Sequence, residues 1–371
     1  MRIAIDARKL RDYGIGTYVR NLLRELARID ATTEYSVLCR EQDCRIVHDM
    51  GANFHAVKET AGAYSIGEQF AVPLDLRRER VNLFHAPHYV LPPLTPCRSV
   101  VTIHDCIHLR FPQYLPNRIA YAYARASLWT ATHRAARVLT VSETSKRDIL
   151  EYFRIPESRV EVIYNAIDER FWQQPTADDM ERVRERYQLN APFVLYAGNI
   201  KPHKNLERLI EAFNMLRQTP HLKDVQLLII GDEISKYAAL RRAVHRHKLH
   251  RHVRFFGFVS DQTLAALYRL ADVFVFPSLY EGFGLPPLEA MASGTPVITS
   301  NVSSLPEVVG DAAIKIDPYD PSAIAEALGR VLTDAALRAD LRARGLERAR
   351  SFSWERSIRR VREVYDEVLA G

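Results

Sequence analysis

Residues 272–300, DVFVFPSLYEGFGLPPLEAMASGTPVITS, contain every part of a strand–helix–strand unit. DVFVFPS and PVITS each predict a buried strand, because apolar, β-branched and aromatic residues dominate both runs. Between them, PPLEAMASG predicts a short helix that proline can begin and Gly294 can end. Glu281 stands in the loop before this helix and Glu289 stands inside it. The stretch therefore predicts two parallel strands, with two carboxylates that bracket a glycine-rich turn.

The same alternation of short β-rich runs and longer helical patterns extends in both directions from this stretch. It predicts an α/β fold, in which helices cover both faces of parallel sheets. The predicted strands of the first half are MRIAIDA, EYSVLC, NLFHAP, RSVVTIHD and ARVLTVS, and those of the second half are FVLYAGNI, DVQLLIIGD, RFFGFV, VFVFPS, PVITS and AIKID.

The length predicts two domains, because 371 residues exceed the usual size of one core. Both periodicities break in YNAIDERFWQQPTADD, residues 164–179. We therefore expect Rossmann-like domains at 1–170 and 185–350, which face each other across a cleft lined by the carboxyl ends of their strands. The helix predicted within 351–371 has no strand after it, and we expect it to pack back on the first domain.

The composition is that of a folded protein with excess positive charge. No apolar run is long enough to span a bilayer, and the N-terminal apolar run is too short for a secretory signal, so we expect a cytoplasmic protein. The four cysteines show no C-x-x-C spacing, which favours reduced thiols. The net charge of +6 indicates an anionic partner, which could be nucleic acid, a lipid headgroup or a phosphorylated substrate.

Two basic segments could contact such a partner. Residues 241–254, RRAVHRHKLHRHVR, predict an exposed helix face, and nucleic-acid binding is disfavoured because no aromatic residues are interleaved for base stacking. Residues 117–138 mix four arginines with Tyr121, Tyr123 and Trp129 at helical spacing. This segment has two interpretations: a helix on an anionic membrane surface, or, as we favour, a helix that packs its aromatic stripe into the core.

Glycines and polar residues stand where parallel strands are expected to end. Gly14 and Gly16 come before the first predicted helix, whose free N–H groups could hold an anion. Val19 stands where the dinucleotide fingerprint needs glycine or alanine, so the pattern does not indicate an NAD enzyme. His104 and Asp105 follow another predicted strand, at the edge of the sheet where ligands of α/β proteins bind.

Lys204 stands just before a helix that is predicted to begin near Asn205. A positive charge opposes the helix dipole, which favours an anion at its N-terminus. A bound phosphate would resolve this conflict, and an ordinary solvated lysine is the alternative.

The two glutamates of the opening stretch indicate recognition of hydroxyl groups. Carboxylates are repelled by phosphate but accept hydrogen bonds from hydroxyls. Glu281 and Glu289 would therefore suit two sugars of one ligand, whose phosphates lie against the backbone of Gly282 and Gly284. The alternative is a pair of exposed glutamates.

These motifs together resemble retaining glycosyltransferase family four. EGFGLPPLE is similar to the two family glutamates that seven residues separate, and DARKLRDYGIGTYVRNLLREL, TIHDCIHLRFP, TVSETSKRDIL, VIYNAID and GNIKPHKNLERLI resemble further family segments in matching order. The similarity leans towards bacterial mannosyltransferases of O-antigen and polysaccharide assembly. The resemblance implies the GT-B fold, with an acceptor-binding N-terminal domain and a C-terminal domain that binds a nucleotide sugar.

The resemblance also implies roles for individual residues. His104 would lie beside the anomeric carbon, Glu281 would hold the transferred sugar, and Lys204 would neutralise the departing diphosphate; these three form the expected catalytic set. Glu289 would bind the ribose, and the backbone near Phe258 would meet the nucleobase. The expected donor-binding residues are Gly16, Gly198, Asn199, Lys204, Phe258, Val259, Glu281, Gly282, Phe283, Gly284, Leu285 and Glu289.

The implied reaction moves a hexose, with mannose favoured, from a nucleotide diphosphate sugar to a hydroxyl of a glycan or a polyprenyl-linked glycan. GDP-mannose is the favoured donor and a UDP-sugar is the alternative; neither a metal ion nor a cofactor is expected. A lipid-linked acceptor implies peripheral contact with the inner face of the cell membrane. Two other classes stay open: another GT-B enzyme such as a nucleotide-sugar epimerase, and a non-catalytic protein that binds sugar nucleotides.

Two positions depart from the family pattern. Asn199 stands where many members carry arginine, so stabilisation of the leaving group must depend more on Lys204, a helix N-terminus or another arginine. Ala166 stands where the family often has glycine, and we expect this change to affect only the turn between the domains.

Overall fold

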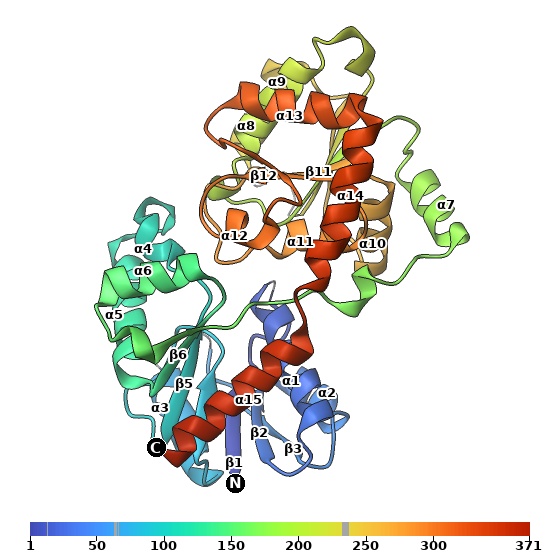
Figure 1. Ribbon diagram of the computed structural model, residues 1–371. Helices are drawn as coiled ribbons and strands as arrows, with labels where there is room; N and C mark the ends of the chain where they lie inside the picture. Colours follow the sequence, from blue (N-terminus) through green and yellow to red (C-terminus); the bar gives the residue numbers. More distant parts are fainter. Residues whose placement is uncertain (13, 63–64, 66, 232–236) are drawn as a thin grey trace. The chain divides into compact units, whose positions relative to one another are not determined.

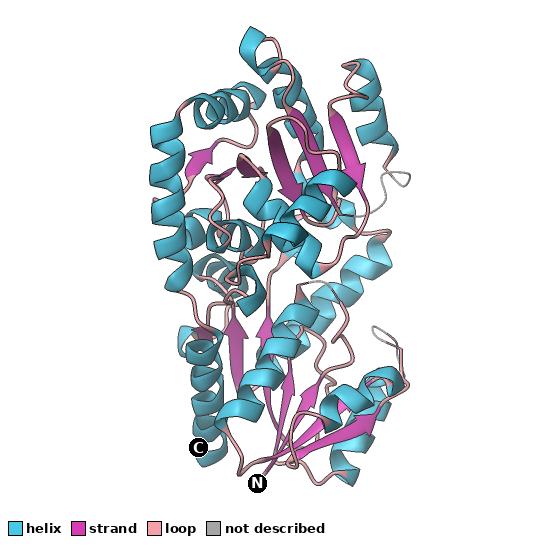
Figure 2. Cartoon of the chain, turned by 90° about the vertical axis from the view of Figure 1, so that its right-hand side faces the viewer, coloured by secondary structure: helices cyan, strands magenta, loops and turns pink. Residues whose placement is uncertain are grey.

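The computed structural model describes residues 1–12, 14–62, 65, 67–231 and 237–371. These residues form two units: an N-terminal unit of Met1–Ala166 with Ser353–Gly371, and a C-terminal unit of Ile167–Phe352 (Figure 1). Each unit is a parallel sheet with helices on both faces (Figure 2). The predicted α/β class is therefore confirmed.

The sheet of the N-terminal unit has the order β3-β2-β1-β4-β5-β6-β7 within the described residues. Its strands are β1 (Arg2–Asp6), β2 (Glu34–Cys39), β3 (Phe54–Lys58), β4 (Leu83–Ala86), β5 (Arg98–Ile103), β6 (Arg137–Thr140) and β7 (Val160–Val162). Its helices are α1 (Ile15–Ile29), α2 (Cys44–His48), α3 (Glu68–Arg78), α4 (Ile107–Arg110), α5 (Arg118–Arg134), α6 (Glu143–Phe153) and α15 (Trp354–Ala370). The sequence did not predict β3 and β7, which lie at the two edges of the sheet.

The sheet of the C-terminal unit has the order β10-β9-β8-β11-β12-β13 within the described residues. Its strands are β8 (Phe193–Ala197), β9 (Gln226–Ile230), β10 (Val253–Phe256), β11 (Val273–Phe276), β12 (Val297–Ser300) and β13 (Ile314–Ile316). Its helices are α7 (Ala177–Arg186), α8 (Leu206–Leu216), α9 (Ala238–Arg246), α10 (Asp261–Leu270), α11 (Leu285–Ala292), α12 (Leu305–Val309), α13 (Pro321–Thr333) and α14 (Ala335–Arg350).

The strand order reverses once in each sheet. In the C-terminal unit, β8 pairs with β9 on one side and with β11 on the other. In the N-terminal unit, β1 lies between β2 and β4. Loops that leave such neighbouring strands run in opposite directions and open a crevice at the carboxyl edge of the sheet. Each unit therefore offers one favoured position for a ligand.

The last helix of the chain, α15, completes the N-terminal unit. It packs beside α1, where Arg28 pairs with Glu355 at 2.7 Å and Arg362 pairs with Asp30 at 2.5 Å (Figure 1). The inner face of α15 includes Trp354 and Tyr365, which are 5% and 0% exposed. The helix is therefore part of the core of this unit, although about half of the chain separates it from β7.

Helix α5 corrects one expectation. The sequence favoured an aromatic stripe packed into the core. Tyr121 does pack against the core of this unit, but Trp129 is 54% exposed and Ile119 is 80% exposed. Small and aliphatic residues fill most of the buried side, since Ala124 and Leu128 are at most 3% exposed. Small residues let a helix approach the sheet closely, which leaves the larger ring of Trp129 on the outside. No helix in the described part of the chain is long and apolar enough to cross a membrane.

We predict that Gly231→Ala destabilises the C-terminal unit by about 2–4 kcal/mol, because the new side chain has no room. A Cβ at Gly231 would lie 2.1 Å from the carbonyl oxygen of Gly198, which is backbone and cannot move aside. Chemical denaturation followed by circular dichroism measures the change. Gly257→Ala is the matched control, since a Cβ there has no neighbour within 4 Å. Equal stability of the two variants would contradict the prediction.

Candidate functional site

An ion pair joins the two segments that leave the sheet at the reversal point of the C-terminal unit. Lys204 ends a 3-10 turn after β8, and Glu281 lies in the loop after β11. The ammonium of Lys204 donates to Oε1 of Glu281 at 2.5 Å, and both side chains are at least 87% buried. The backbone joins the same segments, because the N–H of Leu279 donates to the carbonyl of His203 at 2.7 Å. We call the residues around this pair the switch-point site.

The burial of Lys204 and Glu281 decides between earlier alternatives. The interpretation of Lys204 as an ordinary solvated lysine is wrong, because the residue is only 8% exposed and its ammonium lies over the ring of Phe276 at 5.1 Å. Glu281 is likewise not an exposed glutamate. The charge that should conflict with the dipole of α8 is balanced by a carboxylate of the chain itself, which a sequence pattern could not show.

Two serines hold the loop that carries Glu281. The hydroxyl of Ser303 accepts from the N–H of Glu281 at 3.0 Å and donates to its carbonyl at 2.7 Å. Ser304 donates to the carbonyls of Glu281 and Phe283 at 2.9 and 2.7 Å. The sequence analysis assigned these serines no function. Their position just after β12, in the next loop along the carboxyl edge, is the signal that could have identified them.

A glycine stands at each end of helix α11. Gly284 adopts φ +113° at the N-cap of α11, and a Cβ there would lie 2.7 Å from Leu305. Gly284 has no side chain to cap the helix, and Pro286 and Pro287 carry no N–H, so Gly284 and Leu285 supply its free N–H groups. Leu285 begins the helix, and Gly294, with φ +77°, follows its C-cap. The predicted end of the helix at Gly294 is confirmed, and its start lies one residue before the proline that was predicted to begin it.

Glu289 lies inside α11 in an environment that disfavours its charge. Its Oε2 accepts a hydrogen bond from the hydroxyl of Tyr268 at 3.1 Å. Burial raises the pKa of Glu289 to about 7, although the Tyr268 hydroxyl and the charge of Arg170 both act to lower it. A partly buried carboxylate with a single hydrogen-bond donor still has acceptor capacity for a ligand.

The other predicted donor-binding residues of this unit lie along the same edge. Gly198 and Asn199 follow β8, and Phe258 and Val259 follow β10, where the Phe258 side chain is 73% exposed. Three buried side-chain oxygens at this edge have no hydrogen-bond partner among the residues that the structure describes: Asn199 Oδ1 after β8, Ser278 Oγ after β11 and Ser300 Oγ at the end of β12. Buried polar atoms are normally satisfied, so these atoms are available to a water molecule or a ligand.

His104 occupies the carboxyl edge of the N-terminal unit, directly after β5. Its Nε2 lies 2.9 Å from the carbonyl oxygen of Pro87, and the hydroxyl of Ser145 donates to the backbone carbonyl of His104 at 3.0 Å. Burial lowers the pKa of His104 to about 4, with smaller contributions from His88 and Lys9. The ring is therefore neutral near pH 7, its Nε2–H donates a hydrogen bond to the carbonyl of Pro87, and its Nδ1 is left as an acceptor.

Gly16 has a packing role in the N-terminal unit. A Cβ at Gly16 would lie 2.6 Å from the carbonyl oxygen of Leu10, so only glycine allows α1 to meet the loop after β1. Gly14, the N-cap residue, has φ +24°.

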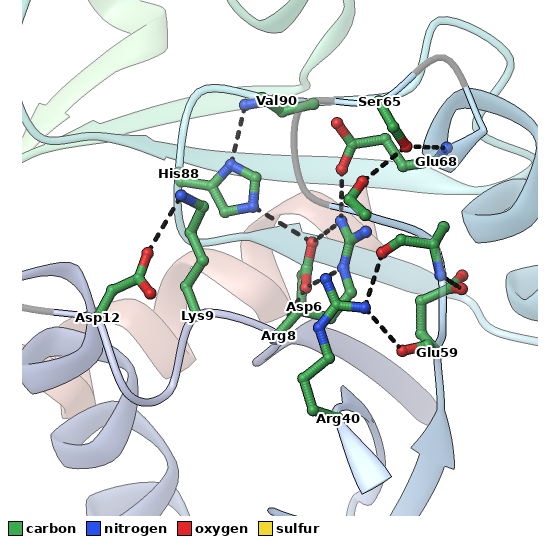
Figure 3. A network of polar contacts seen from close by, with 12 residues as sticks. Asp6, Arg8, Lys9, Asp12, Arg40, Glu59, Ser65, Glu68, His88 and Val90 are labelled. Carbon is green, nitrogen blue, oxygen red and sulfur yellow. Dashed lines mark hydrogen bonds and ion pairs between the residues drawn. The ribbon is translucent and has the colours of Figure 1, made fainter.

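The sequence analysis missed a cluster of buried charges at the carboxyl ends of β1 and β4, which Figure 3 shows in close-up. Arg8 pairs with Asp6 at 2.6 Å and with Glu68 at 3.0 Å, and Nε2 of His88 lies 3.3 Å from the Asp6 carboxylate (Figure 3). Burial opposes the charge of Asp6, but the Arg8 guanidinium nevertheless holds the pKa of this carboxyl well below its ordinary value. The cluster fixes the loop from Pro87 to Val90, whose first residue binds His104.

The described residues contain no group of three His, Cys, Asp or Glu side chains placed to hold a metal ion. The four cysteines are free thiols.

Models of glycosyltransferase families match the sequence of each unit. The family model for glycosyl transferases group 1 matches residues 179–348, and that for Glycosyltransferase Family 4 matches residues 13–171. The chain is 35% identical over 291 residues to the O-antigen chain mannosyltransferase B of Escherichia coli, across 78% of this chain and 75% of that protein. The chain belongs to glycosyltransferase family 4.

Two further comparisons extend this assignment. The glycosyltransferase is 31% identical over 286 residues to the serotype-specific mannosyltransferase WbdA of Escherichia coli, of which it spans about a third (34%). Its structure matches the sucrose-phosphate synthase of Thermosynechococcus elongatus with a TM-score of 0.81 and 24% identity, over 100% of this chain and 99% of that one. The GT-B class that the sequence predicted, with its two Rossmann-like domains, is confirmed.

We predict that Glu289→Gln stabilises the protein by about 1–3 kcal/mol at pH 8.5 and has little effect at pH 5. The pKa of Glu289 is raised to about 7, so between its ordinary value of 4.5 and about 7 the folded state binds more protons than the unfolded state. Stability therefore falls as pH rises through this window, and the neutral glutamine avoids that cost. Urea unfolding at both pH values measures the difference.

Glu326→Gln, on the exposed side of α13, is the control and should leave stability unchanged at both pH values. A Glu289→Gln variant that is less stable than the wild type at pH 8.5 would contradict the prediction.

Proposed function

We propose that this glycosyltransferase transfers mannose from GDP-mannose to a hydroxyl group of a glycan or polyprenyl-linked glycan, with retention of configuration and without a metal ion. The names of the relatives support mannose, since both curated relatives described above are mannosyltransferases. The choice of guanine as the base of the donor rests on the same similarity to these relatives, and a UDP-sugar is the alternative donor.

The ion pair between Lys204 and Glu281 is the observation that carries the proposal. Cleavage of the anomeric C–O bond leaves a negative charge on the departing diphosphate, and stabilisation of that charge is the largest contribution an enzyme can make. An ammonium has three donors, and Glu281 accepts from one of them at 2.5 Å. Lys204 can then donate to the diphosphate while Glu281 turns its second oxygen to a sugar hydroxyl.

The remaining predicted residues divide between the other parts of the donor. The N–H of Leu285 at the start of α11 and the backbone of Gly282, Phe283 and Gly284 suit the diphosphate. Glu289 suits the ribose hydroxyls, and the loop with Phe258 and Val259 suits the base. This arrangement is compatible with Asn199 in place of arginine, because Lys204 and the uncapped end of α11 supply the positive potential.

In the proposed reaction the acceptor hydroxyl attacks the face of the sugar that the diphosphate leaves. The new bond joins the acceptor oxygen to the anomeric carbon, the bond to the diphosphate breaks, and the hydroxyl proton passes to a phosphate oxygen. Glu281 is a poor nucleophile here, because Lys204 holds its carboxylate. His104 contributes as a neutral ring, whose Nδ1 accepts a hydrogen bond from a hydroxyl of the sugar.

The defining experiment measures mannose transfer from GDP-mannose to a synthetic polyprenyl-diphosphate-linked oligosaccharide. We expect acceptor-dependent release of GDP, an α-mannoside detected by NMR, and a loss of about 100-fold or more in kcat/KM for Lys204→Met. Lys223→Met, an exposed lysine before β9, is the control and should keep full activity.

The other outcomes separate the alternatives. Transfer from UDP-glucose but not GDP-mannose would assign the other donor, and interconversion of nucleotide sugars without an acceptor would indicate an epimerase. Binding of a nucleotide sugar, seen as a higher melting temperature, without any reaction would indicate a non-catalytic binder. A fully active Lys204→Met variant would overturn the role of the ion pair.

Helix α5 supports peripheral contact with an anionic membrane. Its exposed face carries Ile119 and Trp129 between three arginines, Arg118, Arg125 and Arg134, and the helix contains no acidic residue. Helix α3 adds the exposed side chains of Phe70 and Leu74, and the two helices meet where Tyr123 donates to Glu68. Apolar and basic side chains on one face suit a surface of anionic headgroups. Such contact would bring the enzyme to a lipid-linked acceptor.

We predict that Ile119→Ser/Trp129→Ser weakens binding to phosphatidylglycerol-containing vesicles about tenfold or more, because it removes the apolar area that the membrane would bury. Vesicle sedimentation measures the binding. Ile46→Ser, on α2, changes an exposed isoleucine 43% accessible to solvent and is the matched control. Unchanged binding of the double variant would exclude this face, whereas activity on a water-soluble acceptor should stay normal.

A further inference from the structure

A chain of buried hydrogen bonds runs through the N-terminal unit from α15 towards His104. The hydroxyl of Tyr365 lies 2.6 Å from Nδ1 of His85, and Nε2 of His85 lies 2.8 Å from the hydroxyl of Thr102. Thr102 in turn lies 3.2 Å from the hydroxyl of Tyr18. The four residues belong to α15, β4, β5 and α1, so the chain joins the two central strands to the two helices that cover them.

The final contact of this chain is between two rings. Tyr18 packs its ring against the imidazole of His104 in an edge-to-face arrangement, with centroids 5.0 Å apart and planes at 81°. Tyr18 also contacts Trp354 of α15 at 6.1 Å. His104 is otherwise held by Pro87 at Nε2 and by Ser145 at its carbonyl. Tyr18 therefore contacts the imidazole on an axis separate from its hydrogen bond to Pro87 and restricts the tilt of the ring.

This row of hydrogen-bonded side chains places polar groups at positions where apolar groups are usual. Tyr18, His85, Thr102 and Tyr365 are at most 2% exposed. Central strands of parallel sheets are normally apolar throughout, as their neighbours Phe84 and Val101 are. Burial lowers the pKa of His85 to about 3, so its ring is neutral, with one donor and one acceptor. The ring therefore donates in one of its two contacts and accepts in the other.

Stability alone does not account for these residues. A buried hydrogen bond contributes only a small net stabilisation, and replacing both of its partners with apolar groups of the same shape can be neutral or stabilising. A network of this kind does, however, give a core one defined arrangement. The group at its end that needs a defined arrangement is His104.

We infer that Tyr365, His85 and Thr102 are positioning residues, which hold Tyr18 and through it orient the imidazole of His104 for the transfer reaction. The inference rests on the proposed role of His104 at the reacting sugar. A displacement of about 1 Å at a reacting group can cost roughly 100-fold in rate, so the tilt of this ring is worth fixing. The last helix of the chain would then support the site without contacting substrate.

Tyr365→Phe tests the inference, because it removes one hydroxyl and keeps the ring. We expect kcat for mannose transfer to fall about tenfold with KM for the donor unchanged, since orientation in the transition state is lost and binding is not. Tyr35→Phe is the matched control. It removes a hydroxyl of a residue that is equally buried in the same unit. This hydroxyl donates to Asp30 at 2.9 Å and is not part of the hydrogen-bonded row that ends at Tyr18. This variant should keep the kcat of the wild type.

The same change in a His104→Ala background separates this inference from the proposed function. If Tyr365 acts through His104, Tyr365→Phe has no further effect on kcat once His104 is removed. The inference is overturned if the tenfold loss persists in the His104→Ala background, or if Tyr365→Phe lowers kcat in neither background. The hydrogen-bonded residues would then have a structural role only. Full activity of His104→Ala overturns the role of His104 and the inference with it.

Thr102→Val and Thr102→Ser provide a second test if Tyr365→Phe folds poorly. Valine keeps the shape but breaks both central hydrogen bonds, and it should lower kcat about as much as Tyr365→Phe, whereas serine keeps the hydroxyl and should restore activity. Thermal unfolding of each variant ensures that kcat is measured on folded enzyme. Equal kcat for valine and serine would also overturn the inference.

Discussion

The reversal of strand order between β8 and β11 is the constraint on which the candidate site of the C-terminal unit depends. It sends the loop after β8 and the loop after β11 apart, and Lys204 and Glu281 meet across the opening that results. The contacts that hold the loop of Glu281 follow from the same order of strands. The loop after β12 is the next along the edge, so Ser303 and Ser304 can reach the backbone of Glu281. Lys204 and Glu281 are thus held by each other and by these serines, although both lie in connections between strands and helices.

Much of this arrangement could be predicted from the sequence, because it depends on local rules. Continuous apolar runs identified most strands, and proline and glycine marked the ends of α11. The edge strands β3 and β7 were missed, because β3 is only partly buried beyond Phe54 and β7 has three residues. The position of Trp129 was predicted wrongly, because helical spacing identifies a stripe of residues but not the side that faces the sheet.

The contacts that define the sites could not be predicted, because they join distant parts of the chain. Lys204 and Glu281 are 77 positions apart, and His85 and Tyr365 are 280 apart. The segments of Lys204 and Glu281 marked them as candidate site residues but did not show that they pair, and nothing in their own segments marked His85 or Tyr365. These side chains matter because they are buried in pairs. Burying an unpaired charge or imidazole costs free energy, whereas a buried pair holds both groups in one defined arrangement. The charged cluster around Arg8 escaped notice for the same reason.

The position of α15 also constrains how the chain can fold during synthesis. Domains usually fold in the order in which the ribosome makes them. Here the N-terminal unit needs residues 354–370, which are made only after the whole of Ile167–Phe352. Until then Tyr18 and His85 lack the helix that covers them, and a stretch of apolar surface stays open on the sheet. The C-terminal unit, whose residues are continuous, is therefore the one that can finish first, and it must do so beside an incomplete neighbour.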